Sequence, residues 1–168
     1  GLAVPATIKG FEPLYIQRIA QLTNKSNQFN LTTLRCSEDD IRAMAGDKND
    51  LCLCGKLVDK FGDNGIVTVG AGRQQGDVLD LTLWLMSCRV LKRGMEDAMM
   101  DTVVAEAAAR GVKTIVGHYY PTAKNAMVRE FYAQYDFVKT AEDADGNTEW
   151  TLDVAAYTPK HPHMKIER

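Results

Sequence analysis

The sequence lacks several features that would assign the protein to a specialised class. No apolar run reaches about 18 residues, so no segment has the length and composition of a membrane-spanning helix. The chain does not open with a secretory signal peptide. The four cysteines form no C-x-x-C pair, and no Cys/His spacing is typical of zinc. We therefore expect a cytosolic protein with four reduced thiols, without a metal site or a membrane partner.

An excess of charge of either sign is also missing. The 168 residues include 22 acidic and 20 basic side chains, a net charge of −2. Binders of nucleic acid and of anionic membranes need clustered positive charge, so this balance argues against both classes. Apolar residues make up 45% of the chain and charged residues 25%, which excludes wholesale disorder. The length predicts a single domain with a core of its own.

The patterns that are present predict one layered α/β structure. Apolar residues repeat at helical spacing in three segments, and Ser37 with Asp40 at its N3 position marks the start of a fourth helix. Apolar runs bounded by turn residues indicate six strands. We expect helices over 12–26, 37–46, 95–110 and 124–135, and strands over 51–60, 66–71, 78–88, 114–119, 137–141 and 148–154. No internal repeat or second composition regime divides the chain.

The domain boundaries follow from this reading. We expect the domain to span 11–156, with 1–10 as a linker or a short edge strand and 157–168 as a polar tail. Because the first residue is glycine rather than methionine, we interpret the chain as a fragment of a longer protein.

The two faces of the strand over 78–88 differ in composition. Alternation along a strand places successive side chains on opposite faces. We therefore expect Leu79, Leu81, Leu83 and Leu85 on one face, and Asp80, Thr82, Trp84, Met86 and Cys88 on the other.

The segment after that strand resembles an anion-binding element. Arg89, Lys92 and Arg93 precede Gly94 and the start of the next expected helix. A helix N-terminus offers unpaired N–H groups and a partial positive charge, which suit phosphate. The alternative is a basic loop with an ordinary helix cap.

A second segment combines an asparagine at an expected helix start with a tyrosine two turns later. Asn125 begins the segment, and Tyr132 lies on its apolar stripe. A tyrosine in this position is either a core residue or, if its hydroxyl reaches a reacting group, a catalytic acid.

Together these two segments resemble the core motifs of the GNAT N-acyltransferase superfamily. Its pyrophosphate loop reads Gln/Arg-x-x-Gly-x-Gly/Ala, and this frame is matched, with Lys92 in place of the first glycine, by Arg89, Val90, Leu91, Lys92, Arg93 and Gly94. The later frame Asn-x-x-Ala-x-x-x-Tyr-x-x-x-Gly-Phe is matched, with Val128 for alanine and Asp136 for glycine, by Asn125, Val128, Tyr132 and Phe137. The resemblance implies an α/β fold of the GNAT (acyl-CoA N-acyltransferase) type, a mixed sheet flanked by helices.

A narrower resemblance is to the C-terminal domain of FkbH-like proteins. It rests on four segments in order, which are 21–33, 59–65, 87–94 and 121–125. FkbH-like proteins carry an N-terminal domain of the HAD phosphatase type and place a glyceryl group on an acyl carrier protein, for methoxymalonyl-type polyketide extender units. The resemblance implies two partners, a carrier protein and the HAD-phosphatase-like domain of the same full-length chain.

The resemblance also implies roles for the matched residues. The loop from Arg89 to Gly94 would hold phosphate of CoA or of carrier-protein phosphopantetheine, and Lys92 favours the latter, which has one phosphate. Asn125 would fix the arm through its amide, and Tyr132 would protonate the departing thiolate. No general base is evident. Asp80 is either a candidate for this role or a polar residue at the end of its strand.

Cys88 is a candidate nucleophile. It ends a strand beside Arg89 and precedes a helix N-terminus, an environment that lowers a thiol pKa. A transient acyl-cysteine is the functional interpretation, and a buried small apolar residue is the alternative.

The remaining candidates are polar residues in loops that would contact substrate. A polyol pocket or, alternatively, a hydrogen-bonded turn is indicated by Asn27, Gln28, Asn30 and Thr32. Asp63 and Asn64 are hairpin residues or substrate contacts. Thr122 and Lys124 contact a phosphate or carboxylate, or they cap a helix.

Three functions follow from these patterns. The first is a GNAT-like acyltransferase that moves a small hydroxy-acyl group, glyceryl by resemblance, to or from a phosphopantetheine thiol. The second is a catalytically silent GNAT-like domain that docks a carrier protein. The third is an ordinary acetyl-CoA N-acetyltransferase acting on an amine.

Overall fold

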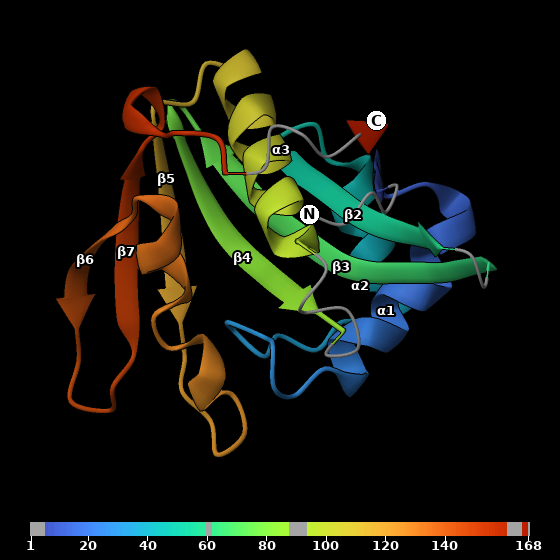
Figure 1. The fold of residues 1–168 in the computed structure, drawn as a ribbon, viewed down its shortest axis with the longest axis horizontal. Helices are drawn as coiled ribbons and strands as arrows, with labels where there is room; N and C mark the ends of the chain where they lie inside the picture. Colours follow the sequence, from blue (N-terminus) through green and yellow to red (C-terminus); the bar gives the residue numbers. More distant parts are fainter. Residues whose placement is uncertain (1–5, 60–61, 88–93, 161–165, 168) are drawn as a thin grey trace.

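A computed structural model describes residues 6–59, 62–87, 94–160 and 166–167. Within them, one sheet has the strand order β6-β7-β5-β4-β3-β2-β1-β8 (Figure 1). Its strands are β1 (Ala6–Gly10), β2 (Asp50–Asp59), β3 (Gly62–Gln75), β4 (Val78–Met86), β5 (Thr114–Tyr119), β6 (Val138–Glu142), β7 (Thr148–Asp153) and β8 (Ile166–Glu167). The β4–β5 and β1–β8 pairs are parallel and the other pairs are antiparallel. The expected mixed sheet is confirmed.

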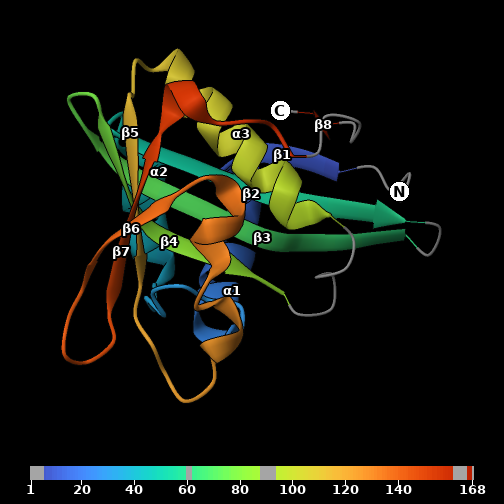
Figure 2. The same ribbon diagram turned by 60° about the vertical axis from the view of Figure 1, so that its left-hand side comes forward.

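Helices cover both faces of this sheet. Helix α3 (Met95–Ala109) crosses one face, and α1 (Ile16–Lys25) and α2 (Glu38–Gly46) lie against the other (Figures 1 and 2). Two hydrophobic clusters correspond to these layers, one including the buried side chains of α3 and the other those of α1 and α2. A central sheet with helices on both of its faces is the layer architecture that the sequence predicts.

Local signals fix the ends of the helices. Ser37 caps α2, because its hydroxyl accepts a hydrogen bond from the Asp40 N–H while the Asp40 carboxylate accepts one from the Ser37 N–H. This reciprocal pair satisfies two N–H groups that a helix start leaves unpaired. Helix α3 is followed by Gly111 at φ +79°, a backbone conformation that glycine adopts without strain. The prediction of both helices is confirmed.

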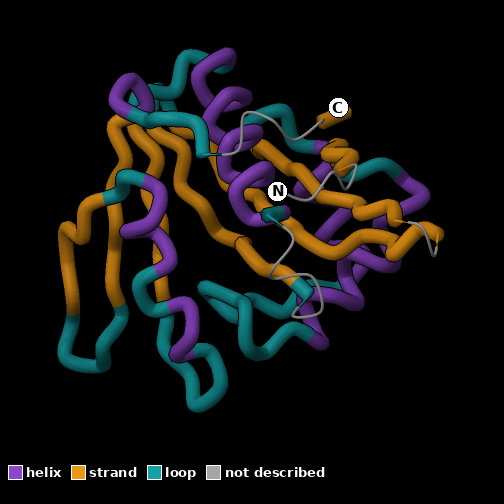
Figure 3. Tube along the Cα trace, in the orientation of Figure 1, coloured by secondary structure: helices purple, strands orange, loops and turns teal. Residues whose placement is uncertain are grey.

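The expected helix over 124–135 is wrong. The segment forms two short 3₁₀ turns, Ala126–Val128 and Phe131–Tyr135, between β5 and β6 (Figure 3). Its aromatic residues are buried as expected, with Phe131 packed against Tyr132 and Tyr135 at ring-centroid distances of 5.3 and 5.0 Å. An apolar stripe specifies burial, but it does not distinguish i+3 from i+4 hydrogen bonding.

A β-bulge changes which side chains β4 presents to each face. Ala71 of β3 lies opposite Leu83, but its neighbour Gly72 lies opposite Leu81, so Thr82 is the additional residue. Leu79 and Leu81 consequently share a cluster with Trp84 and Met86, while Leu83 and Leu85 belong to the cluster on the opposite face. The predicted uniform alternation along β4 is therefore wrong beyond Thr82, because the extra residue reverses the phase of all later side chains.

The pairing of β2 with β3 extends further toward their connection than expected. Asp63 pairs with Val58, so Asp63 and Asn64 belong to the backbone of β3 rather than to a loop over 61–65. Asp63 lies ten residues along β3 from Arg73, the residue opposite Asp80. At about 3.3 Å per residue, roughly 33 Å of strand separates these two substrate candidates from the level of Asp80.

Both ends of the described chain join the fold. Residues 6–10, read as a linker or a short strand, form β1 and pair with β2, with Ile8 fully buried. After β7, the chain crosses α3, where Tyr157 donates its hydroxyl and Lys160 its backbone N–H to the Asp101 carboxylate.

Candidate functional site

Strands β4 and β5 diverge partway along their length. Their parallel pairing covers three positions, from Val78 opposite Thr114 to Asp80 opposite Val116. The bulge at Thr82 follows directly. Gly72 permits this geometry, because a Cβ atom there would lie 2.7 Å from the carbonyl oxygen of Asp80. Beyond Asp80 a gap opens in the centre of the sheet, at the carboxyl ends of two parallel strands, where α/β folds place their ligands.

The chain's own segment Phe29–Thr32 fills this gap. Leu31 donates its N–H to the Trp84 carbonyl (3.0 Å) and accepts from the Tyr120 N–H (2.9 Å), so it links β4 to the end of β5. The Phe29 carbonyl accepts from Met86 N–H (3.0 Å). In Figure 1 this blue segment lies between the lower ends of β4 and β5. It acts as a short strand that completes the sheet.

Asn125 holds the inserted segment in place. It is fully buried, and its amide Nδ2 donates to the carbonyls of Asn30 and Tyr120, both at 3.0 Å. Its Oδ1 accepts from the Thr122 N–H at 2.8 Å and from the Tyr119 hydroxyl at 3.3 Å. The amide predicted to fix a pantetheine arm is thus engaged within the fold.

Asn30 and Thr32, two of the predicted substrate residues, also make internal contacts. Asn30 is fully buried, donates from Nδ2 to the Ser26 carbonyl and accepts at Oδ1 from the Thr33 N–H. Thr32 donates to the carbonyl of the bulge residue Thr82 at 2.9 Å. Asn30 fits the alternative of a hydrogen-bonded turn, while Thr32 also lines a pocket.

That pocket lies where β4 and β5 separate, on the face opposite α3. Its volume is about 330 Å³, and its lining residues are Thr32, Leu34, Asp80, Leu81, Thr82, His118 and Tyr120. Leu34 and Tyr120 are exposed hydrophobic residues. A concave site with a few convergent polar groups among apolar ones is typical of small-molecule recognition.

A histidine between two carboxylates is the chemical centre of the pocket. His118 Nε2 lies 2.5 Å from Asp80 Oδ1, and His118 Nδ1 lies 3.9 Å from Glu149 Oε1. The His118 side chain is 18% exposed, against 50% for Asp80 and 47% for Glu149. Because an ionised carboxylate only accepts, Asp80 requires the proton on Nε2 and leaves the Nδ1 lone pair available. The arrangement can accept a proton and stabilise the resulting imidazolium.

Tyr120 borders the same pocket. Its ring centroid lies 5.9 Å from that of His118. Burial, and next the charges of Asp80 and Glu149, raise the pKa of the Tyr120 phenol. Tyr120 therefore remains a neutral hydrogen-bond donor beside His118.

Tyr132 lies behind the sheet, against the backbone of β5. It is 1% exposed, and its hydroxyl is buried without a hydrogen bond of normal geometry. Burial raises its pKa, although the nearby main chain of His118 acts in the opposite direction. The ring is a core residue, as one interpretation predicts, while its unpaired hydroxyl retains the proton that a general acid needs.

The predicted phosphate loop lies outside the described residues. This holds for Arg89, Val90, Leu91, Lys92 and Arg93 and also for Cys88. Gly94 is described, and it precedes α3 at φ +74°. The pyrophosphate-loop frame has glycine or alanine at this position, and glycine adopts this left-handed backbone conformation without strain.

The other loop candidates divide between capping and a second cavity. Thr122 accepts from the N–H groups of Lys124 and Asn125, both at 3.1 Å, so it closes the loop before the first 3₁₀ turn, and the helix that it was predicted to cap does not form. Asn27, Gln28 and Lys124 line a cavity of about 670 Å³ beside the ends of α1 and β4. These three residues were predicted to contact substrate, and the structure places them on one cavity that does not include His118.

Sequence reasoning missed His118 and Glu149. Each lies on an expected strand, and nothing in the spacing of either residue marks a site. The available signal was a histidine near the carboxyl end of β5, parallel to the strand that carries Asp80. Combining strand order with that residue type would have paired them.

The described part of the chain contains no group of three or more His, Cys, Asp and Glu side chains placed to hold a metal ion. Its helices are too short or too polar to cross a membrane.

Comparisons with known proteins identify the fold. No family model matches the chain, and no curated protein is similar to it in sequence. Among solved structures, the chain is similar to the ribosomal-protein-S18-alanine N-acetyltransferase from Escherichia coli (TM-score 0.66, 15% identity, 89% of this chain and 94% of that chain covered). It is also similar to the GNAT domain of S. lividans PAT (TM-score 0.68, 14% identity, coverage 90% and 94%).

A third similar structure is spermidine N-acetyltransferase from Vibrio cholerae in complex with CoA and spermine (TM-score 0.65, 9% identity, coverage 89% and 96%). At these identities the likeness concerns the fold and not the activity. Over about nine-tenths of its length, the chain has the mixed sheet and flanking helices of the GNAT acyl-CoA N-acyltransferase fold.

Proposed function

We propose that the protein is an acyltransferase that uses a phosphopantetheine thioester as acyl donor and the His118 pocket as the acceptor site. The observation that carries this proposal is the His118–Asp80 pair, at 2.5 Å, in a pocket where two parallel strands of a GNAT-type fold diverge. A positioned base of this kind contributes about 10²- to 10⁴-fold to a proton-transfer step.

The reaction uses groups on both sides of the sheet. An acceptor amine or hydroxyl attacks the thioester carbonyl as His118 Nδ1 takes its proton. The C–S bond then breaks, and Tyr132 gives its hydroxyl proton to the departing thiolate. This step requires the segment Phe29–Thr32 to leave the gap between β4 and β5, because the Tyr132 hydroxyl is buried on the α3 side of the sheet. Asp80 positions the imidazole and stabilises its protonated form, and solvent returns the protons afterwards. CoA, or the phosphopantetheine of a carrier protein, supplies the activated acyl group when bound.

The identity of the acyl group follows from the sequence resemblance. We propose a small hydroxy-acyl group, glyceryl in type, moved to or from an acyl carrier protein in the formation of methoxymalonyl-type extender units. The HAD-phosphatase-like domain of a longer chain would act on the same carrier. Arg89, Lys92 and Arg93 would contact phosphate in this reaction.

Transfer to an amine is a second candidate for the same site. Two carboxylates, Asp80 and Glu149, flank His118 and are each about half exposed. Such a pair attracts a cationic acceptor. The similar structures include a spermidine N-acetyltransferase, which supports an amine in this position.

A silent docking domain is favoured by a different observation. Phe29 and Leu31 already use the β4 hydrogen-bonding groups of Met86 and Trp84. An extended amide arm that added to this edge of β4 would compete with them. Under this proposal the protein binds a carrier protein without transferring its acyl group.

Thiol release from acyl donors distinguishes these functions. Acetyl-CoA, a glyceryl thioester and a glyceryl carrier protein are incubated with polyamines, lysine peptides and hydroxylated acceptors. We expect turnover with at least one pair and a loss of about 10²-fold or more in His118→Gln. His161, outside the described residues, provides the matched control His161→Gln. Full turnover in His118→Gln would contradict the assigned base, and no turnover with any pair would support the docking function.

A further inference from the structure

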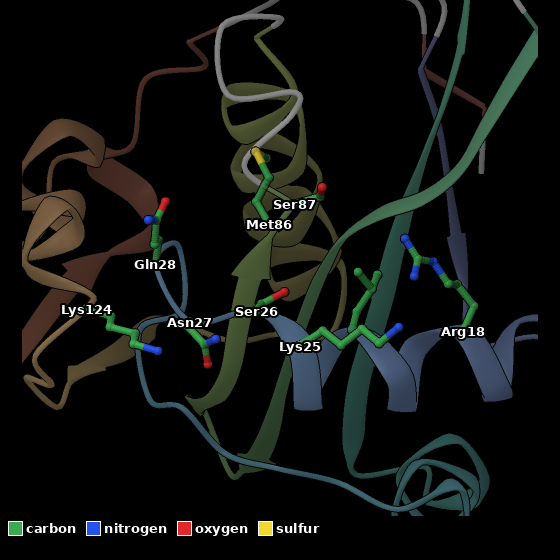
Figure 4. A pocket seen from close by; sticks show the side chains of 9 residues that line it. Arg18, Lys25, Ser26, Asn27, Gln28, Met86, Ser87 and Lys124 are labelled. Carbon is green, nitrogen blue, oxygen red and sulfur yellow. The ribbon is translucent and has the colours of Figure 1, made fainter.

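A basic cavity lies beside the inserted segment and is distinct from the His118 pocket. Its volume of about 670 Å³ is within the usual range of ligand sites. The end of α1, the following loop, the end of β4 and the loop after β5 surround it (Figure 4).

The charge of this cavity is unusual for a chain with a net charge of −2. Arg18, Lys25 and Lys124 line it, and no carboxylate does so among the described residues. Lys124 lies 99 positions after Lys25 in the sequence, so the fold and not a local run of basic residues places both on one cavity. Figure 4 shows Lys124 pointing toward Asn27 from the loop opposite α1, and Lys25 pointing along α1 toward Arg18. Such a cavity selects an anion.

The C-terminal end of a helix normally disfavours anions, because its last carbonyl groups carry partial negative charge. Here two of the carbonyls at this end of α1 are used within the fold. Arg35 Nη1 donates to the carbonyls of Thr23 and Ser26, and Asn30 Nδ2 also donates to that of Ser26. These contacts reduce the partial negative charge that the end of α1 presents beside the cavity.

Polar groups in the cavity complement the charge. Ser26 and Ser87 carry hydroxyl groups, and Asn27 and Gln28 carry amides. Ammonium, guanidinium, hydroxyl and amide donors together suit a group with several acceptor oxygens, such as phosphate.

The cavity lies at one end of the segment whose other end lines the His118 pocket. Asn27 lines the cavity and Thr32 lines the pocket, five residues later. Five residues span at most about 17 Å. An arm with a phosphate at one end, two amides and a thioester at the other has a length of the same order.

We propose that this cavity binds the phosphate of the donor's phosphopantetheine arm, whose thioester end then reaches the His118 pocket. This rests on the proposed function and adds Lys25 and Lys124 to the phosphate contacts proposed for Arg89, Lys92 and Arg93. Both CoA and a holo carrier protein present the same phosphate-linked arm, so the site is defined by their shared chemistry.

Calorimetry with 4′-phosphopantetheine and with pantetheine, which lacks the phosphate, tests the proposal on the full chain. We expect the wild type to bind 4′-phosphopantetheine at least tenfold more tightly than pantetheine. Lys25→Gln and Lys124→Gln should each weaken 4′-phosphopantetheine binding fivefold or more and leave pantetheine binding unchanged. The control variant Lys113→Gln changes an exposed lysine directly before β5, and it should leave the affinity for both probes unchanged.

Equal affinity of the wild type for the two probes would overturn the proposal. Unchanged affinity for 4′-phosphopantetheine in both lysine variants would also overturn the proposal. The proposed function would still stand if His118→Gln abolishes turnover. A loss of affinity in both variants supports the site, even if turnover in His118→Gln contradicts the assigned base. CoA and a holo carrier protein are then compared, and the donor whose affinity falls in both variants is the source of the arm.

Discussion

Gly117 lies directly beneath the ring of Tyr132. A Cβ atom at Gly117 would lie 2.5 Å from Cζ of Tyr132 and 2.7 Å from both Cε atoms. Atoms in contact do not approach so closely, so the flat fit of the ring on β5 requires glycine at this position. The contact places the Tyr132 hydroxyl beside the main chain of His118 and links the residues proposed as acid and base.

Replacing Gly117 with alanine should therefore displace the Tyr132 ring. We expect Gly117→Ala to lower the free energy of unfolding by about 1–3 kcal/mol, the usual cost of overpacking. Urea denaturation measures this change. Gly46→Ala is the control, because nothing lies within 4 Å of a Cβ atom at that position. If the penalty of Gly117→Ala persists in a Tyr132→Leu background, the clash with the ring is not its cause.

Tyr132→Phe separates the hydroxyl from the packing of the ring. The hydroxyl is buried and unpaired, so its removal should leave the thermal midpoint unchanged or raise it. Turnover should fall by about 10²-fold or more if the hydroxyl protonates the thiolate. A stable variant with wild-type turnover would make Tyr132 a core residue only.

Asn125→Ala should release the inserted segment from the end of β5. The change removes four side-chain hydrogen bonds and leaves the Asn30 and Tyr120 carbonyls unpaired, at a cost of about 2–4 kcal/mol. Hydrogen exchange should show faster exchange of the Leu31 and Tyr120 amides.

A matched control for that experiment is Asn147→Ala. Asn147 pairs with Asp143 in the β6–β7 turn, and its loss should not alter exchange at Leu31. Unchanged protection of Leu31 in Asn125→Ala would show that backbone pairing alone holds the segment.

The cysteines should differ in their reaction with iodoacetamide. Burial raises the pKa of Cys52 and of Cys54 to about 12 and also raises that of Cys36. At pH 8 a thiol with a pKa of 12 is only about 0.01% thiolate, so the folded protein should not be labelled at Cys52 or Cys54. Cys88 is predicted to react at pH 7, and a glyceryl thioester should then leave an adduct on it. Labelling of Cys88 only after denaturation would exclude it as the nucleophile.

Asp136 should make the stability of the fold depend on acidic pH. Lys160 Nζ, and next the Thr158 N–H, donate to its carboxylate and hold its pKa below the ordinary value of 3.8. A lowered folded-state pKa stabilises the protein above that value, and the contribution disappears as the pH falls through the folded-state pKa. Asp136→Asn should therefore lower the thermal midpoint at pH 7 and converge with the wild type near pH 2. The effect should be below about 1 kcal/mol, because the pair lies at the surface, where solvent screens it.

The glycine of the GNAT frame provides a second variant at this position. Asp136 has φ +69°, so Asp136→Gly relieves backbone strain while it removes the contact with Lys160. If the thermal midpoints of Asp136→Gly and Asp136→Asn differ by the same amount at pH 7 and at pH 2, the difference arises from the backbone and not from the carboxylate. A wild-type midpoint independent of pH between these values would contradict the role of the carboxylate.

The sequence by itself determined the elements whose signals are local. Ser37 and Asp40 satisfy the start of α2, Gly111 follows α3, and alternation gives β5 its bounds of Thr114–Tyr119. Each of these signals depends on hydrogen bonds or side-chain spacing within a few residues. The motif frames likewise indicated the GNAT fold, because their spacing follows the order of the elements.

Tertiary structure alone decided the composition of the candidate site. The bulge at Thr82 reverses the faces of β4, and the segment Phe29–Thr32 enters the sheet, both of which depend on pairing with distant strands. His118 meets Asp80, 38 positions earlier, because β4 and β5 are parallel neighbours that diverge at this level. Register and strand order bring such residues together, and no pattern within a single segment specifies either.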